Sequence, residues 1–465
     1  MTDAKVIWPP YPYEAGFCIT DDPDASTVAQ TRAVYDFLIS KSFVTTKAVW
    51  VFEPESRCGV PPIPDSALRG ITLADQSFAS YCSELSKSGF ELCLHGASAG
   101  NNKREQTLNA FQMFSEKLGK SDTFICHSKN ADNIYWEDKT TSLFPFNLLL
   151  NIYSKQTCSG EISGSPYYWG DVCNSNINQI RLYRTRCSNT LKRNPSMPYF
   201  NPQKPLVNGW FSATKRPLAY CADNIQIEQL KKENGLTVLY QYLHRYANPE
   251  TNALDQHFVR SINRISGDSK ILIQTVSSIM KRLRQIQGVF VVFHDKSFWL
   301  INVNDEAVDN LQIKTERPLA IDMQDDNLLS TGCLLVVKYL PGNSIKHIQV
   351  SNPITFSQKN SFPMNQSRQI KSSIPFGELL INLSEVGLRT PDNRIVLPGS
   401  FFLKTQRSGT GFPLLSIMPP WEEFGLLSDQ IGLIAREVIF KGRSLNIQKY
   451  LDATREIPME SHDNW

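Results

Sequence analysis

The sequence has almost no excess charge of either sign. Its 465 residues include 48 lysines and arginines against 45 aspartates and glutamates, which gives a formal net charge of +3. The basic residues are spread along the chain, and the densest group is MKRLRQ at 280–285. Because nucleic-acid binding needs clustered positive charge against the phosphates, this distribution predicts no nucleic-acid partner.

Long hydrophobic runs are missing as well. No apolar run approaches the ~18 residues that a membrane-spanning helix needs. The N-terminal segment MTDAKVIWPPYPYEAG lacks the basic region and apolar stretch of a secretion signal. The ten cysteines include no CxxC pair, and several lie in apolar runs such as FCIT and FICHS. That cysteine usage is typical of reduced, buried thiols, so we expect no disulfide framework. Together with the missing apolar runs and secretion signal, it predicts a cytoplasmic protein with no transmembrane segment.

The first half of the chain alternates short apolar runs with helical patterns. Strands are predicted at 16–20, 48–53, 90–96, 123–128 and 236–244, and helices between them at 26–42, 73–89 and 102–119. This alternation is typical of parallel βαβ units, which close into a barrel or form an open, doubly wound sheet. We place this domain at residues 1–287.

Beyond residue 287 the pattern changes. Closely spaced strand-like runs at 289–294, 298–303, 309–314, 319–323, 333–340 and 345–350 predict a small antiparallel β-sandwich at 288–352. The polar stretch at 353–373 is interpreted as a linker. Residues 374–465 form a C-terminal α+β extension to which the sequence assigns no role.

Titratable side chains follow the best strands of the first domain. The first strand ends on Asp21 and Asp22, and the later ones end on His95, His127 and His244. The carboxyl ends of parallel strands share one face, where α/β folds build their active sites. A single histidine at such a position is more often a hydrogen-bonded structural residue, but the four positions together indicate a site. Carboxylate and imidazole are ligands for zinc or a similar divalent ion.

These motifs resemble those of a known family. CITDDPD, then GFELCLHG about seventy residues later and LTVLYQYLH near residue 240, are similar to motifs of the polysaccharide deacetylases, carbohydrate esterase family four, whose domain is the NodB homology domain. SGSPYYWGDVC (163–173) and NPSMPYFNPQKPLVNGWFS (194–212) look like a divergent branch found among bacterial surface-polysaccharide gene products. The resemblance covers about residues 10–290 and implies a distorted (β/α) barrel.

The resemblance also implies roles for individual residues. Asp21 is then the general base, Asp22 and His95 are metal ligands, and His244 is the acid that protonates the departing amine. Trp169, Tyr168 and Trp210 are candidates for stacking on a sugar ring, and Asp171 for contacting its hydroxyls. Aromatic residues are, however, more often part of the core.

The chain departs from the family pattern in three ways. The family has a second histidine four residues after the first, and Ala99 occupies that place. Pro23 replaces the glycine after the acid pair, and no Arg-x-Pro-Tyr follows the fourth strand. Either another residue supplies the third metal ligand, with His127 the first candidate and Asn101 or Asn102 next, or metal binding is weakened or lost. For His127, the roles of ligand, substrate contact and structural residue all stay open.

The function that the sequence predicts is therefore a metal-dependent hydrolase, with zinc as the expected metal. It would remove an N-acetyl group from a sugar, nucleotide-linked or lipid-linked, during assembly of a bacterial surface polysaccharide such as O-antigen or capsule. Two alternatives stay open: a non-catalytic carbohydrate-binding protein on a degenerate barrel, and a glycoside hydrolase that uses Asp21 and another acid. The sequence does not indicate an oligomeric state.

Overall fold

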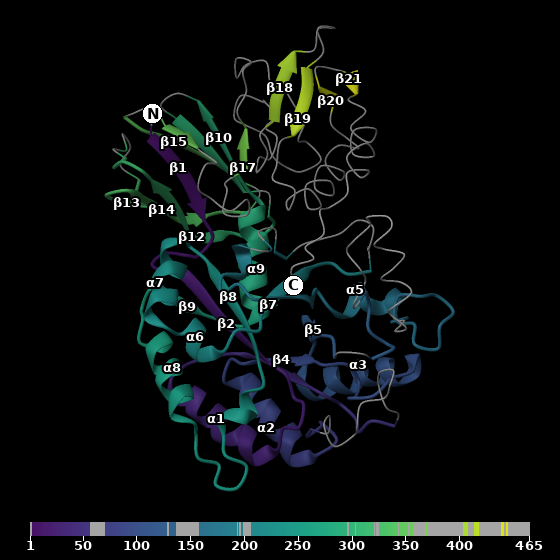
Figure 1. The fold of residues 1–465 in the computed structure, drawn as a ribbon. Helices are drawn as coiled ribbons and strands as arrows, with labels where there is room; N and C mark the ends of the chain where they lie inside the picture. The colour runs from purple at the N-terminus through teal and green to yellow at the C-terminus, as the bar shows by residue number, and fades with distance from the viewer. Residues whose placement is uncertain are drawn as a thin grey trace, which may run out of the picture. The chain divides into compact units, whose positions relative to one another are not determined.

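The chain was analysed as a computed structural model (Figure 1). The structure describes residues 2–55, 70–127, 130–135, 158–192, 194, 197–198, 206–294, 297–302, 304–319, 321, 325–342, 344–351, 354–356 and 368–370, together with the short strands 403–407, 413–417, 439–440 and 443–444. Two compact units divide the described chain. One comprises the described residues of Ala15–Met280, and the other those of Met1–Glu14 and Lys281–Ile457.

The first unit is a closed barrel of parallel strands. The strand order is β3-β4-β5-β6-β7-β8-β2, and a further pairing of β2 with β3 closes the ring of seven. An eighth strand, β9, adds to β2. The strands are β2 (Ala15–Asp21), β3 (Thr46–Val49), β4 (Glu91–Leu94), β5 (Thr123–Ile125), β6 (Gln179–Thr185), β7 (Trp210–Thr214), β8 (Leu236–Gln241) and β9 (Ile271–Ile273). The (β/α) barrel that the sequence predicted is thus confirmed.

Helices connect the strands of the barrel. The predicted helices at 26–42, 73–89 and 102–119 are confirmed with slightly shorter bounds, as α1 (Val28–Ser40), α2 (Gln76–Lys87) and α3 (Arg104–Leu118). Thr27 and Asp75 cap the first two by accepting hydrogen bonds from backbone N–H groups of the first turn. The others are α5 (Cys173–Asn176), α6 (Leu218–Cys221), α7 (Asn224–Lys232), α8 (Gln256–Ser266) and α9 (Val276–Gln287). None of the helices in the described ranges combines the length and apolarity needed to cross a lipid bilayer.

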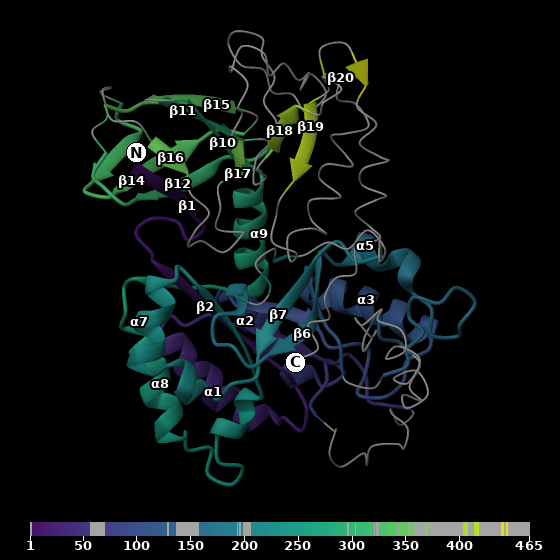
Figure 2. The same ribbon diagram turned by 45° about the horizontal axis from the view of Figure 1, so that its top comes forward.

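Every residue of β2 is buried. A strand covered on both faces is expected in a parallel barrel, where helices pack outside and side chains fill the inside. The strands β6 and β7, which the sequence patterns did not reveal, lie side by side in Figure 2 and complete the ring between β5 and β8.

A buried carboxylate ties the amino ends of three strands to α9. Glu91 opens β4 and accepts hydrogen bonds from the hydroxyls of Thr46 and Thr123, which open β3 and β5. It also accepts from the backbone N–H of Ser277 in the first turn of α9, at 2.9 Å. Burial raises the pKa of Glu91, although these donors oppose that shift. The Glu91 carboxylate therefore links three strands and α9 at the end of the barrel opposite the strand ends that carry the histidines.

The second unit consists of two sheets. One has the order β13-β14-β12-β1-β16 and the other β15-β11-β10-β17. The strands are β1 (Thr2–Ile7), β10 (Val289–His294), β11 (Ser297–Asn302), β12 (Val308–Thr315), β13 (Leu328–Thr331), β14 (Leu334–Leu340), β15 (Ser344–Gln349), β16 (Ile354–Phe356) and β17 (Arg368–Ile370). Five of the six predicted strands are present, whereas 319–323 contributes only a bridge from Ile321 to Val350.

The N-terminal strand belongs to this second unit. β1 pairs antiparallel with β12 and parallel with β16, so it lies inside the five-stranded sheet. The sequence pattern had placed residues 1–14 with the barrel. β16 and β17 fall within the predicted linker, and the rest of 357–465 is described only as the short hairpins β18 (Leu403–Arg407) with β19 (Pro413–Ile417) and β20 (Ile439–Phe440) with β21 (Arg443–Ser444).

Candidate metal centre

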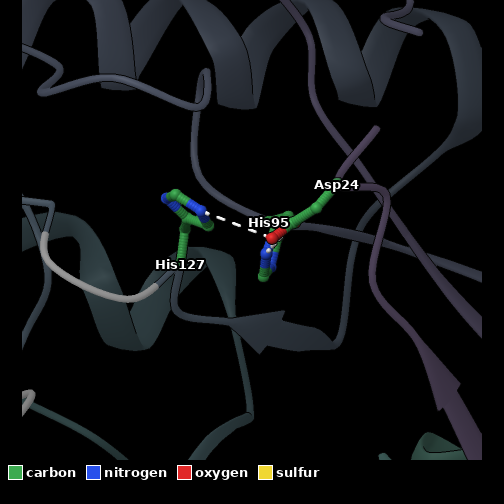
Figure 3. A group of neighbouring side chains, drawn as sticks. All are labelled: Asp24, His95 and His127. Atoms are coloured by element: carbon green, nitrogen blue, oxygen red, sulfur yellow. Dashed lines mark ion pairs between the residues drawn. The ribbon is translucent and has the colours of Figure 1, made fainter. Parts of the chain in front are cut away.

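Three buried side chains converge at the carboxyl ends of the barrel strands. Asp24 follows β2, His95 follows β4 and His127 follows β5. Figure 3 shows the Asp24 carboxylate facing both imidazoles. The Nε2 atom of His95 lies 3.5 Å from Asp24 Oδ1, and that of His127 lies 3.7 Å from Asp24 Oδ2. One ligand atom from each residue lies within 4.8 Å of the others, so this group is able to hold a metal ion.

The hydrogen bonds of the two rings fix which nitrogen faces the centre. His95 Nδ1 lies 2.8 Å from the carbonyl oxygen of Ile125, which only accepts, so Nδ1 carries the proton. His127 Nδ1 lies 2.9 Å from Asn130 Oδ1, and the Asn130 amide is oriented by its N–H donation to the Gly100 carbonyl at 2.7 Å. In the neutral rings Nε2 then carries the lone pair. Metal-binding histidines are commonly held in this way through their second nitrogen.

The spacing of these atoms fits a metal better than it fits hydrogen bonds. At 3.5 and 3.7 Å the contacts are longer than ordinary hydrogen bonds. Within the described part of the chain, neither Asp24 Oδ1 nor His95 Nε2 has a hydrogen-bond partner. Ligand atoms about 2.0–2.1 Å from a tetrahedral zinc are about 3.4 Å apart. The buried donor set and its spacing therefore fit a divalent cation.

The charge of Asp24 is compatible with a bound cation. Burial alone raises the pKa of the Asp24 carboxyl, but interactions with His127 and His95 lower it well below its usual range. That lowering requires positive charge on the imidazoles. A cation bound between the three side chains would supply the same positive charge while both rings stay neutral.

Asp22, the predicted metal ligand, has an arginine partner. Arg181 of β6 donates to both Asp22 carboxylate oxygens at 2.6 Å, and it also donates to the Thr20 hydroxyl at 3.2 Å. Because β6 and β2 are not neighbours in the sheet, this contact crosses the barrel interior. Asp22 Oδ2 lies 3.6 Å from His95 Nε2, so the carboxylate borders the candidate centre.

Asp21, the predicted base, lies on the other side of β2. Its Oδ2 accepts hydrogen bonds from Lys47 Nζ at 2.8 Å and the Tyr35 hydroxyl at 2.9 Å, and its Oδ1 accepts from the Leu243 backbone N–H at 2.7 Å. Successive side chains of a strand point to opposite faces, so Asp22 points into the barrel and Asp21 towards α1, which carries Tyr35.

His244 lies in a 3-10 turn at Leu243–Tyr246, directly after β8. The side chain is buried, and its Nδ1 has no hydrogen-bond partner among the described residues. Burial lowers the pKa of His244, with Lys47 and Arg245 acting in the same direction while Asp21 and Asp24 oppose them. These interactions place the imidazole within electrostatic reach of both the buried ion pair and the candidate centre.

Asn101 and Asn102 hold the loop that follows His95. The Asn101 side-chain oxygen accepts from the backbone N–H of Ala131, and Asn102 donates to Asp132 at 3.1 Å. This loop reads Gly-Ala-Ser-Ala-Gly at 96–100, which matches the G-x-S-x-G motif of the serine-hydrolase nucleophile elbow. The serine is buried, its hydroxyl donates to Asn102, and it is not among the described residues with positive φ. The loop therefore supports the histidines rather than presenting a nucleophile.

The predicted sugar contacts differ in their burial. Trp169 is fully buried, and its indole N–H donates to the Asp132 carbonyl at 2.6 Å. Trp210 is also buried, and its ring stacks on Tyr135. Asp171 is exposed and forms a bidentate ion pair with Arg104, whose guanidinium also lies near the Tyr168 ring. Both tryptophans belong to the interior in this structure.

Sequence reasoning missed Asp24 and Arg181. Asp24 is the third acid of the TDDPD segment, so the signal was present, two residues beyond the neighbouring pair. Pro23 separates it from Asp22, and the chain leaves β2 there. Arg181 lies 159 positions from Asp22, in a strand without a clear apolar pattern, and no local signal links the two.

Comparison with known proteins identifies similar folds. No family profile and no curated protein sequence matches the chain. Among solved structures it is similar to a family 4 acetyl xylan esterase from Clostridium thermocellum in complex with a cobalt ion, with 12% identity and a TM-score of 0.29 over 58% of this chain and 91% of that one. A novel carbohydrate deacetylase shares 10% identity with a TM-score of 0.38, over 74% of this chain and 66% of the other.

A probable polysaccharide deacetylase from Pseudomonas aeruginosa is also similar, with 10% identity and a TM-score of 0.32 over 59% of this chain and 94% of that one.

Proposed function

We propose that the protein is a metal-dependent hydrolase that removes an N-acetyl group from a sugar. The observation that carries the proposal is the buried group of Asp24, His95 and His127 at the carboxyl ends of the barrel strands. An ionised carboxylate and two imidazoles with their Nε2 atoms turned to one point form a ligand set for zinc. The ordered motifs of the first domain support the deacetylase class.

Asp24, His95 and His127 would hold the ion. This assignment keeps two of the residues expected from the sequence and replaces Asp22 by Asp24. When bound, a divalent ion supplies Lewis-acid polarisation of the acyl carbonyl and lowers the pKa of water. Asn130 and the Ile125 carbonyl keep the two rings in the required orientation.

Asp22 is assigned the role of general base. Its Oδ2 atom lies 3.6 Å from His95 Nε2, whereas the oxygens of Asp21 are bonded to Lys47, Tyr35 and Leu243. Arg181 donates one hydrogen bond to each oxygen of Asp22, and each oxygen retains a further acceptor site. Asp22 is therefore able to take a proton from an attacking water at this position.

His244 keeps the role of proton donor to the leaving amine. Because burial lowers its pKa, the protonated imidazole is a stronger acid than an exposed histidine. Its Nδ1 atom makes no hydrogen bond within the described residues, so that nitrogen is not committed to a structural contact. The donor role requires the protonated form, and activity should decline as pH rises through the pKa of His244.

The pathway rests on the sequence motifs. The divergent-branch segments at 163–173 and 194–212 support a role in assembling a bacterial surface polysaccharide, with an N-acetylated sugar as substrate. A cytoplasmic location is part of the proposal. The substrate would then be an activated or lipid-linked sugar.

Metal content and acetate release test this function together. The protein should contain about one zinc or similar ion per chain by elemental analysis and release acetate from a panel of N-acetylated sugars. Asp24→Ala and His95→Ala should lose both properties. Glu228→Ala, which removes an exposed acid paired with Lys231 on α7, is the matched control and should keep both.

Absence of metal after reconstitution would contradict the proposal. Bound metal without hydrolysis of any sugar would instead favour a carbohydrate-binding protein. Cleavage of a glycosidic bond that survives Asp24→Ala would favour the glycoside hydrolase.

A further inference from the structure

An ion pair is buried beside the candidate site, outside the metal-binding group. Asp21 and Lys47 are register partners on β2 and β3, and their charged atoms are 2.8 Å apart. Each side chain is only 1% exposed. Removing two charges from water costs free energy that their attraction often fails to recover, so such a pair is weak evidence for stability. The pair therefore calls for another explanation.

Asp21 of this pair is also hydrogen-bonded to the turn that carries His244. Asp21 Oδ1 accepts from the Leu243 backbone N–H at 2.7 Å, while Lys47 and Tyr35 occupy Oδ2. The donor is the first residue of the 3-10 turn, where a backbone N–H has no partner within the turn. A charged acceptor makes this bond stronger than a neutral one.

A second side chain holds the same turn from α1. The Gln30 amide is buried and donates to the carbonyls of His244 and Ala247 at 3.3 and 3.0 Å. The backbone on both sides of the His244 ring is thus anchored. The ring nitrogen Nδ1, by contrast, makes no hydrogen bond within the described residues. The imidazole packs edge-on against the ring of Tyr242, two residues before it, with centroids 6.3 Å apart, so its position depends on the turn and not on a hydrogen bond at Nδ1.

We propose that Asp21 is a positioning residue that fixes the His244 turn. Lys47 and Tyr35 hold its carboxylate in place by donating hydrogen bonds to Oδ2. This inference rests on the proposed function, because it is the proposed proton-donor role of His244 that gives the position its catalytic meaning. It gives Asp21 a role different from that of the general base.

Charged groups around His244 allow the proposal to be tested through the pKa of its imidazole. Asp21 and Asp24 from the end of β2, Lys47 from β3 and Arg245 from the turn itself all act on its ring. Removing the Lys47 charge should raise the pKa of His244, and a freer, more hydrated ring would shift it in the same direction. A scaffold residue that merely fills space would leave this titration unchanged.

Hydrogen exchange and NMR test the position without any substrate. In Asp21→Ala, exchange of the Leu243 amide should speed up about tenfold or more, because its hydrogen bond is lost. In Lys47→Met, the His244 ring should titrate at higher pH than in the wild type. The resonance is assigned with His244→Gln, which is feasible because the chain has seven histidines.

Two further variants guard against loss of folding. Asp21→Asn/Lys47→Met removes both charges and keeps an oxygen that accepts from Leu243, so it should preserve Leu243 protection. Lys231→Met removes another lysine–carboxylate contact, 2.9 Å from Asp268, and should leave both readouts at wild-type values. With substrate, Asp21→Ala should reduce kcat by about 100-fold through misplacement of the proton donor.

Two results would overturn the inference. One is wild-type Leu243 exchange and wild-type His244 titration in folded Asp21→Ala. The other is complete loss of hydrolysis in the double variant while both readouts stay normal, which would make Asp21 itself the base. If the wild type hydrolyses no substrate, the proposed function fails, but exchange and titration still decide the positioning role.

Discussion

Arg181 binds both carboxylate oxygens of Asp22 from the far side of the barrel, at 2.6 Å each. This pair is neutral as a whole. Two acids, Asp22 and Asp24, lie beside His95. Within the described part of the chain, Asp24 contacts the imidazoles of His95 and His127 but no lysine or arginine. Asp22 is thus paired with a cationic side chain of the barrel, whereas Asp24 faces only the two imidazoles among the described residues.

Replacing Arg181 should destabilise the barrel strongly. In Arg181→Met the Asp22 carboxylate stays buried without its partner, so the free energy of unfolding should fall by about 3–5 kcal/mol. Urea unfolding followed by circular dichroism measures the change. The double variant Asp22→Asn/Arg181→Met removes both charges and should recover most of the loss. Equal stability of the two variants would show that the ion pair is not the cause.

Asn130 should control metal affinity without binding the metal. Asn130→Ala removes the acceptor for His127 Nδ1–H, and loss of such a partner weakens metal binding by about 10–100-fold. Competition with a chromophoric chelator gives the affinity. Asn176→Ala, which removes an amide bonded to the Val172 carbonyl, is the control and should bind metal normally. Unchanged affinity in Asn130→Ala would remove His127 from the ligand set.

The elements predicted correctly have strong local patterns. The strand ending at Asp21 is an apolar run, and the apolar residues of the helix after it recur with the helical period. Each element could therefore be predicted from its own residues. β6 (QIRLYRT) and β7 (WFSAT) mix polar and aromatic residues, so neither shows the apolar run of a buried strand. In β6 one of the polar residues is Arg181, which points into the barrel. Asp24 was overlooked because the sequence places it outside the neighbouring acid pair, and only the turn after β2 brings it to the histidines.

Glu91 should make stability depend on pH. Its pKa is raised in the folded protein by burial, whereas the unfolded value is about 4.3. Between the two values the folded state holds more protons than the unfolded state, so stability falls as pH rises through this window. Glu91→Gln cannot titrate and should flatten that fall. Urea unfolding of both proteins from pH 4 upward measures it, and parallel pH profiles would refute the assignment.

Removing the N-terminal strand should damage the β unit and spare the barrel. A chain that lacks residues 2–14 leaves β12 and β16 without the strand that joins them. Limited proteolysis should then cleave within 289–356 far faster than in the full chain, while fragments covering the barrel persist. Replacing Asp3 and Lys5 by alanine within β1 is the control and should leave cleavage at the full-length rate.

The pairing of β1 also sets an order of events during synthesis. The strand leaves the ribosome before the barrel strands, yet its partners β12 and β16 follow some three hundred residues later, at 308–315 and 354–356. The barrel strands lie between them and are complete by Ile273. The nascent chain can therefore close its barrel while β1 is still unpaired, so β1, although it precedes the barrel in the sequence, completes its sheet only after the barrel strands have been made.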